Sequence, residues 1–303
     1  MPVYNVEKYI IECMDSIVSQ ETRWSFLVTV VNDGSPDRSR ELLRKYENLP
    51  NVQIIDQENR GSSRARNTAL RHIRGEYVMF VDSDDSLRPG AVEALMNTAK
   101  EYNCDIVQGG SRMFIGERTL SQTAYPDAEH NSSLLGLPWG KVYRAELFGQ
   151  VCFPEGYWFQ DTVLFLIVFE LAERIRTTSA VAYNYRRNVG GVTFSAKGNP
   201  KSLDSLYITR RLMQDRRLLG LGETQQLYEK FLYQLFMNMK RILSIPSRAV
   251  WVSVFEESQK LREDYFKDFR TAKEEYRPLE EALLGGDFRA FFRAITVLWT
   301  SVP

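Results

Sequence analysis

Three carboxylates follow a single apolar run, and their spacing is typical of a site for a hard cation. Residues 77–81 read Tyr-Val-Met-Phe-Val, and Asp82, Asp84 and Asp85 come directly after them. Carboxylates this close raise one another's pKa unless they share a positive charge. Oxygen ligands without a neighbouring His or Cys favour Mg²⁺ or Mn²⁺, which complete their shells with water and substrate phosphates. The cluster therefore predicts a divalent cation and a phosphate-bearing ligand.

A calcium loop and a helix cap both fit the acidic cluster less well. Four oxygen-bearing residues match positions 1, 3, 5 and 12 of an EF-hand calcium loop: Asp82, Asp84, Ser86 and Glu93. Position 6 of that loop must be Gly for the sharp turn, but this chain has Leu87 there, followed by Pro89. Capping of a helix that begins near Pro89 explains one Asp but not three.

The composition limits the classes of partner and compartment. The chain has 303 residues, is 44% hydrophobic, and carries 39 Lys plus Arg against 39 Asp plus Glu. A net charge of zero offers no broad basic field, which disfavours nucleic acid as a partner. Three widely spaced cysteines, Cys13, Cys104 and Cys152, favour a reducing compartment. No signal peptide is recognised, and no apolar run approaches the ~20 residues of a membrane span. We therefore expect a cytoplasmic protein.

Periodicity in the first 110 residues predicts an α/β sheet. Helical spacing over residues 6–17, 37–46, 62–73 and 91–102 alternates with strand-like runs over residues 26–31, 52–55, 77–81 and 104–107. This alternation is typical of a mostly parallel sheet flanked by helices, whose ligands bind at the carboxyl ends of the strands. Polar clusters stand at those ends, at residues 32–35, 59–62 and 82–85.

The second half of the chain changes from mixed to helical character. Loops with one hairpin are expected over residues 112–136, helices over 138–148 and 162–172, and a strand over 180–185. Beyond Pro200, amphipathic helices are expected over residues 201–219, 223–243 and 250–273. A C-terminal apolar stripe favours a core or subunit contact, with docking at the inner face of the membrane as the alternative: Phe288, Phe291, Phe292, Ile295, Leu298 and Trp299.

Four ordered motifs resemble the glycosyltransferase family 2 enzymes, which have the GT-A (nucleotide-diphosphosugar transferase) fold. They are Pro2-Val3-Tyr4-Asn5, Asp33-Gly34-Ser35-Pro36-Asp37, Gly61-Ser62-Ser63-Arg64-Ala65-Arg66-Asn67 and Asp82-Ser83-Asp84-Asp85. The resemblance covers residues 1 to about 195. It implies an α/β, Rossmann-like GT-A domain over residues 1–198, with a nucleotide-sugar half (1–110) and an acceptor half (111–198). Residues 199–303 would be a helical appendage.

The resemblance implies a donor site built from the four motifs. Its nucleotide-sugar-binding residues would be Pro2, Tyr4, Asn5, Asp33, Arg64, Arg66, Asn67, Asp82 and Ser83. Asp33 would bind the base, usually uridine, although its residue type also suits a turn. Arg64, Arg66 and Asn67 begin a helix whose N-terminus could face the diphosphate, or they could belong to a solvated basic face.

The family pattern also implies a metal and a general base. Asp84 would be the direct ligand of Mn²⁺ or Mg²⁺, and Asp82 would contact the ribose or a metal-bound water. The ion would stabilise the charge on the departing diphosphate. Family members commonly carry Glu-Asp before a helix with the Asp as base, which points to Asp161. Gln160 replaces the first acid, and Asp161 could alternatively cap the following helix.

Four residues are candidates for the acceptor side or a lid: Trp139, Lys141, Trp158 and Arg187. The two tryptophans could stack on sugar faces or belong to the core. Residues 185–193 combine arginines with Gly190 and Gly191, as would suit a loop closing over a diphosphate or an ordinary turn. Family members have a strand before the first motif, whereas here the motif follows Met1, so we expect either unpaired backbone beside it or a substitute strand.

The sequence predicts a metal-dependent inverting glycosyltransferase that moves a sugar from a UDP-sugar to a hydroxyl. The acceptor would be a carbohydrate or a lipid-linked or protein-linked glycan, and the C-terminal helix would mediate a homo-oligomeric or peripheral membrane contact. Gln160 and the first-strand departure favour an alternative, a weak or inactive scaffold subunit of a glycosylation complex. A sugar-nucleotide pyrophosphorylase would need a Gly-rich loop with Arg and Lys near its start, and none is found.

Overall fold

The computed structural model describes residues 1–129, 134, 136–188, 196 and 198–301. The chain forms two compact units. The first unit is Met1–Gly156 with Val163–Val189, and the second is Tyr157–Thr162 with Gly190–Pro303. The short segment Tyr157–Thr162 therefore belongs to the helical unit, although first-unit residues precede and follow it in sequence.

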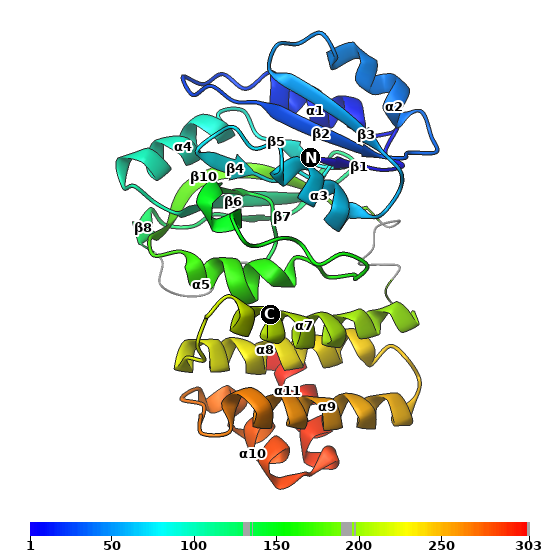
Figure 1. The fold of residues 1–303 in the computed structure, drawn as a ribbon, viewed down its shortest axis with the longest axis vertical. Helices are drawn as coiled ribbons and strands as arrows, with labels where there is room; N and C mark the ends of the chain where they lie inside the picture. The colour runs from blue at the N-terminus through cyan, green and yellow to red at the C-terminus, as the bar shows by residue number, and fades with distance from the viewer. Residues whose placement is uncertain (130–133, 135, 189–195, 197, 302–303) are drawn as a thin grey trace. The chain divides into compact units, whose positions relative to one another are not determined.

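A three-stranded parallel sheet forms the beginning of the first unit (Figure 1). Its order is β1-β2-β3, with β1 at Pro2–Val3, β2 at Val28–Asp33 and β3 at Val52–Gln57. The accompanying helices are α1 (Ile10–Val18), α2 (Ser39–Leu42) with the 3-10 turn η1 (Leu43–Tyr46), and α3 (Ser62–Leu70). Helix α1 buries Ile10, Cys13, Met14 and Ile17, the spacing of one helical face. The alternating pattern predicted for this part is confirmed.

Residues 1–3 themselves occupy the place beside β2. Pro2 pairs with Val31 and Val3 with Asn32, while the Val31 N–H donates to the Met1 carbonyl at 2.9 Å. The backbone of β2 next to the first motif is thereby paired.

The remaining described strands of the first unit form a mixed sheet, shown in green and cyan in Figure 1. The order is β4-β9-β6-β10-β5, with β7 added to β6 and β8 to β10. The strands are β4 (Tyr77–Met79), β5 (Ser86–Leu87), β6 (Ile106–Ile115), β7 (Arg118–Thr123), β8 (Ala128–Glu129), β9 (Lys141–Arg144) and β10 (Ile175–Arg186). Within this sheet β6 and β10 run parallel, whereas the other ladders are antiparallel. A mostly parallel sheet is therefore correct for β1–β3 and wrong for this part of the unit.

One predicted helix is a strand. Residues 138–148 contain β9 followed by the 3-10 turn η2 (Ala145–Phe148). Strand β9 lies between β4 and β6, and its residues Lys141, Val142 and Tyr143 are all buried. A strand buried on both faces shows no polar alternation, so periodicity could not distinguish it from a helix.

Helices cover the mixed sheet where the sequence predicts them. Helix α4 (Ala91–Glu101) packs on β6 and β10, and residues 164–171 form the π-helical turn η3 (Leu164–Val168) and α5 (Phe169–Leu171). Val163 and all five residues of η3 are buried, which accounts for the longest apolar run of the chain. The α/β class of this unit is confirmed.

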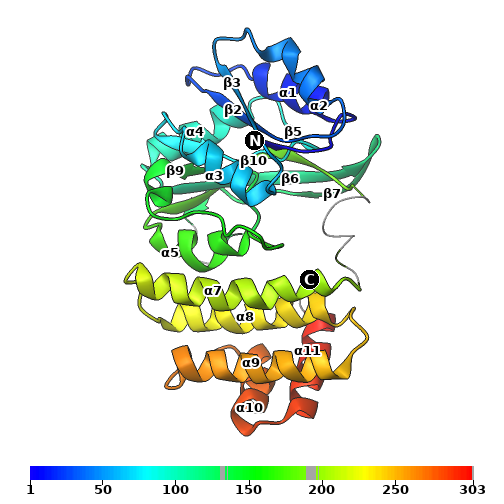
Figure 2. The same cartoon turned by 45° about the vertical axis from the view of Figure 1, so that its right-hand side comes forward.

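The second unit is a stack of helices beyond η4 (Pro200–Leu203). They are α7 (Asp204–Leu218), α8 (Gln225–Ile242), α9 (Arg248–Phe266), η5 (Glu274–Tyr276), α10 (Arg277–Gly285) and α11 (Phe288–Ser301). Thr224 and Ser247 cap α8 and α9 by accepting from Leu227 N and Val250 N. Helices α7 and α8 lie side by side in Figures 1 and 2. The long helices predicted after residue 200 are confirmed, although α9 ends at Phe266 rather than near residue 273.

The C-terminal apolar stripe belongs largely to the core of this unit. Phe291, Ile295 and Leu298 are buried, and α11 packs on α8, α9 and α10. Trp299 is 45% exposed at the edge of the stripe. Among the described residues, no helix has both the length and the apolar character that a bilayer span requires.

Candidate active site

Asp33, at the end of β2, organises the start of the neighbouring helix. Its buried carboxylate accepts from Gln57 Nε2 at 2.7 Å and from the backbone N–H groups of Arg60 at 3.1 Å and Gly61 at 2.7 Å. Gly61 has φ +88°, which L side chains rarely adopt, and it precedes α3. Asp33 therefore fixes the geometry by which β3 leads into α3. Its predicted contact with a nucleotide base stays a prediction.

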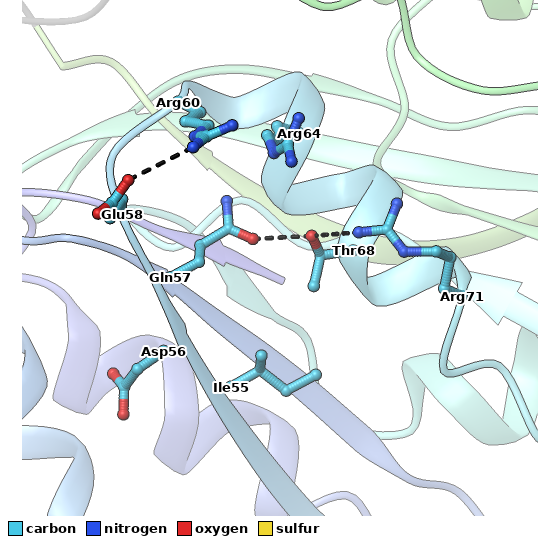
Figure 3. A pocket seen from close by; sticks show the side chains of 8 residues that line it. All are labelled: Ile55, Asp56, Gln57, Glu58, Arg60, Arg64, Thr68 and Arg71. Atoms are coloured by element: carbon cyan, nitrogen blue, oxygen red, sulfur yellow. Dashed lines mark hydrogen bonds and ion pairs between the residues drawn. The ribbon is translucent and has the colours of Figure 1, made fainter.

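A polar pocket of about 330 Å³ lies between the end of β3 and α3 (Figure 3). It is lined by Ile55, Asp56, Gln57, Glu58, Arg60, Arg64, Thr68 and Arg71. Arg71 donates to Thr68 Oγ1 at 2.9 Å, and Thr68 donates to Gln57 Oε1 at 2.7 Å. Because Gln57 also donates to Asp33, one hydrogen-bonded chain joins the pocket to the end of β2. Gln57 and Thr68 were not predicted as site residues, since they belong to no motif and only the fold aligns them.

The two arginines of the third motif have different surroundings. Arg66 is buried and donates through Nη2 to Asp82 Oδ1 at 2.6 Å, with its guanidinium 5.5 Å from the Phe153 ring centroid. Its Nε and Nη1 have no hydrogen-bond partner among the described residues. Arg64 is more exposed and pairs with Glu155 at 3.1 Å. The structure thus joins the third and fourth motifs through the pair between Arg66 and Asp82.

Asn67 is occupied by the protein backbone. Its Nδ2 donates to the Phe153 carbonyl at 2.9 Å and to Glu155 Oε1 at 3.1 Å, and its Oδ1 accepts from the Phe153 N–H at 2.8 Å. Both Asn67 and Phe153 are buried. The side chain predicted to contact the nucleotide sugar therefore fastens residues 153–155 to α3, which favours a structural role.

The acidic cluster divides into an interior and a more accessible part. Asp85 is 1% exposed and accepts from the Tyr183 hydroxyl at 2.9 Å and the Arg186 N–H at 2.7 Å. Burial, followed by the charges of Asp82 and Asp84, raises the pKa of Asp85 to about 9. Asp85 is therefore a structural link between the acidic turn and β10.

Asp84 is braced by the end of β10. Its carboxylate accepts from Asn188 Nδ2 at 3.2 Å, and Arg186 Nε donates to its backbone carbonyl at 2.8 Å. Burial raises the pKa of Asp84, and the charge of Asp82 adds to the effect. The Asp82 side chain is 28% exposed. The ionised form of Asp84 is thus disfavoured in the absence of a further positive charge.

The remaining donor-site candidates belong to the first and fourth motifs and differ in how exposed they are. Tyr4 is 46% exposed in the turn after β1, and Asn5 has a φ of +55°. Pro2 belongs to β1, and Ser83 is buried within the acidic turn. Their contacts with a nucleotide sugar stay predictions.

Of the acceptor-side or lid candidates in the first unit, Trp139 and Lys141 are buried, whereas Arg187 is exposed. Trp139 stacks between the rings of Tyr183 and Tyr185, with centroid distances of 4.7 and 5.2 Å. Lys141 is 1% exposed, and its ammonium donates to the Leu137 carbonyl at 2.8 Å. Their burial favours packing roles. The Arg187 N–H donates to the Phe114 carbonyl at 2.8 Å. Residues 189–193 of the predicted closing loop lie outside the described residues.

Two candidates belong to the second unit. Trp158 and Asp161 lie in the segment Tyr157–Thr162, which precedes the turn into η3. Asp161 is partly exposed, and the Trp158 N–H donates to Asp204 Oδ2 at 2.8 Å. The predicted base is thus carried by a segment that the helical unit anchors.

The model of the glycosyl transferase family 2 matches residues 1–157, which include all four motifs. The chain belongs to glycosyl transferase family 2. This finding confirms the family and the enzyme class that the sequence predicts.

Two proteins named as glycosyltransferases are similar to this chain over about two thirds of its length. Glycosyltransferase GlyA of Streptococcus pneumoniae is 35% identical over 214 residues, covering 64% of this chain and 31% of GlyA. The uncharacterized glycosyltransferase EpsJ of Bacillus subtilis is 32% identical over 212 residues, covering 64% of this chain and 61% of EpsJ. The chain thus matches about a third to three fifths of the length of these relatives.

Solved structures are similar in fold to nearly the whole chain, the helical unit included. Residues 1–349 of TarS from Staphylococcus aureus superpose with a TM-score of 0.72 at 21% identity, covering 99% of this chain and 90% of that one. The same TarS region has been solved with UDP-GlcNAc, with a TM-score of 0.61 at 21% identity and the same coverage. At this level of identity the likeness concerns the fold.

The carboxylates of this family 2 chain fit a divalent ion whose coordination shell is completed by a bound ligand. The described residues contain no group of three or more His, Cys, Asp or Glu placed to hold a metal. Asp84 and Asp82 instead offer two carboxylates, and the raised pKa of Asp84 reflects burial and repulsion that a cation would relieve. Mg²⁺ is usually held by one or two carboxylates together with substrate phosphates. The residues present therefore fit Mg²⁺ or Mn²⁺ bound together with a diphosphate.

Proposed function

We propose that this chain is a metal-dependent, inverting glycosyltransferase that uses a UDP-sugar donor. The observation that carries the proposal is the joined pair of motifs at the strand ends, where buried Arg66 contacts Asp82 beside Asp84. A guanidinium beside two carboxylates suits an anionic diphosphate accompanied by a divalent cation.

Each residue has a distinct task in the proposed reaction. Asp84 and Asp82 would hold the ion, which when bound stabilises the negative charge that develops on the leaving diphosphate. Arg66 would add its positive charge to the stabilisation of the same anion. Asp161 would take the proton from the acceptor hydroxyl, a contribution of typically 10²- to 10⁴-fold. A single displacement with one base inverts the configuration at the anomeric carbon.

The named relatives suggest the substrate classes. TarS of Staphylococcus aureus is a poly(ribitol-phosphate) β-N-acetylglucosaminyltransferase, and its structure has been solved with UDP and with UDP-GlcNAc. The mannosyltransferase PcManGT from Pyrobaculum calidifontis, a structural neighbour with a TM-score of 0.54 at 16% identity, has been solved with GDP-Man and Mn²⁺. By analogy we propose a UDP-sugar donor with Mn²⁺ or Mg²⁺, and a hydroxyl on a glycan as acceptor.

Gln160 favours a second candidate function, a scaffold that binds the donor without turning it over. The family pattern has an acid at this position. An amide cannot take up or release a proton, so Gln160 cannot share in the proton transfer that is proposed for the neighbouring Asp161. The two candidates share the donor site and differ in turnover.

Isothermal titration of UDP with and without Mn²⁺ tests the donor site. We expect Mn²⁺ to strengthen UDP binding and Asp84→Asn to remove that enhancement. Glu117→Gln, an exposed carboxylate in the β6–β7 turn, should leave binding unchanged and serves as the matched control. UDP affinity that is independent of both Mn²⁺ and Asp84 would contradict the proposed metal site.

A screen of UDP-sugars for Mn²⁺-dependent donor hydrolysis tests turnover. Asp161→Asn should retain UDP binding and lose at least 10²-fold in turnover. Mn²⁺-dependent UDP binding without turnover of any donor would favour the scaffold.

A further inference from the structure

The segment that carries Asp161 has a strained backbone. Phe159 has φ +60°, a left-handed backbone region that bulky residues rarely adopt. The Thr162 N–H and hydroxyl both donate to the Phe159 carbonyl, at 3.0 and 2.7 Å, and close a tight turn around Asp161. Such a conformation persists only when surrounding contacts over-determine it.

One set of contacts comes from the residues that begin α7. Asp204 accepts from the Trp158 N–H at 2.8 Å, and Lys201 donates to the same Asp204 oxygen at 2.7 Å. The Lys201 ammonium also lies 5.9 Å from the Trp158 ring centroid. These contacts fix the backbone just before the strained residue.

The second set comes from Arg241 on α8. Its guanidinium carbon lies 4.1 Å from the Phe159 ring centroid, within the range of a cation–π contact. Its Nη1 donates to Ser205 Oγ on α7 at 2.7 Å. Two packed helices therefore hold the guanidinium against the ring of the strained residue.

The charges of Arg241 and Asp161 interact. Burial lowers the pKa of Arg241, and the carboxylate of Asp161 acts in the opposite sense, with a further contribution from Tyr233. An arginine stays protonated in proteins, so the carboxylate experiences a fixed positive charge. Lys201 and Asp204 also carry charges close to this segment.

We propose that Arg241 is a positioning residue for Asp161: it clamps Phe159 and thereby the turn that carries the carboxylate, and it supplies a fixed cation beside that carboxylate. The proposal rests on the proposed role of Asp161 as the base. It assigns a function to the helical region, whose sequence contains no recognisable motif. A nearby cation favours the ionised carboxylate, which is the form that accepts a proton.

Enzyme kinetics of Arg241→Met and Arg241→Lys test the proposal. In Arg241→Met we expect kcat to fall 10- to 100-fold with the donor KM within twofold, because displacement of a base by about 1 Å can cost 10²-fold. The acidic limb of the kcat profile should move up by about one pH unit, since the fixed cation is lost. Arg241→Lys keeps the charge, so its acidic limb should stay near the wild-type position. Arg211→Met, which removes an exposed ion pair on α7, is the control.

Hydrogen exchange supplies a readout that does not depend on turnover. Arg241→Met should raise the exchange rates of the amides in residues 157–162 about tenfold, whereas Arg211→Met should not. Ser205→Ala removes one hydrogen-bond partner of the guanidinium and should raise the exchange rates of the same amides to a smaller extent. It replaces Arg241→Met in this test if that variant does not fold. Unchanged exchange together with an unchanged pH profile would overturn the proposal. Full turnover in Asp161→Asn would instead refute the proposed base, while the exchange measurement would still report on the clamp.

Discussion

The role of Asn67 can be tested by its effect on stability. Asn67→Ala removes both hydrogen bonds to the backbone of Phe153, at 2.8 and 2.9 Å, inside the first unit. Each buried polar group left without a partner costs about 1–3 kcal/mol, so the N–H and carbonyl of Phe153 together give a loss of about 2–6 kcal/mol. This is a large fraction of the 5–15 kcal/mol that is typical of a folded domain.

Urea unfolding and hydrogen exchange measure this loss globally and locally. We expect a lower urea midpoint, and an exchange rate of the Phe153 amide raised about 100-fold for a loss of about 3 kcal/mol. Asn59→Ala removes an exposed side chain that accepts one 3.3 Å bond from Gly61, and it should change stability by less than about 0.5 kcal/mol. Wild-type stability combined with lost UDP binding in Asn67→Ala would refute the structural role and restore the predicted nucleotide contact.

Two further perturbations test the pH dependence and the backbone of the site. The pKa of Asp85 is raised from 3.8 to about 9, so the folded state holds a proton that the unfolded state releases; the free energy of unfolding should fall as pH rises from about 4 to 9. Asp85→Asn should flatten that fall in urea titrations run in metal-free buffer, and an unchanged slope would show that another group is responsible. Gly34→Ala should reduce the free energy of unfolding by about 1–3 kcal/mol and so lower the melting temperature, because Gly34 has φ +65° and a Cβ there would meet Asn59 N at 2.9 Å. An unchanged melting temperature would show that the turn can relax.

The motifs allowed the family and the α/β class to be predicted, and the donor-side carboxylates to be proposed, because the motifs are local in sequence. A short run of residues that ends a strand keeps its chemistry wherever the strand lies, so Asp33, Arg66 and Asp82 could be selected from their motifs alone. The roles of their neighbours were less accessible. Asn67 belongs to the same motif as Arg66, yet its amide faces the backbone of Phe153, 86 positions along the chain.

The sequence by itself determined the alternation of helices α1 to α4 with strands β2, β3 and β4, the helical character of the last hundred residues and the clustering of acids after β4; the two-residue strands β1 and β5 were not predicted. Only the tertiary structure decided that β9 is a strand, that Asp85 is tied to β10, and that Arg241 reaches Phe159. The physical reason is that these features depend on partners distant in sequence. Periodicity reports which side of an element is apolar, whereas pairing, burial and charge contacts depend on which elements the fold brings together.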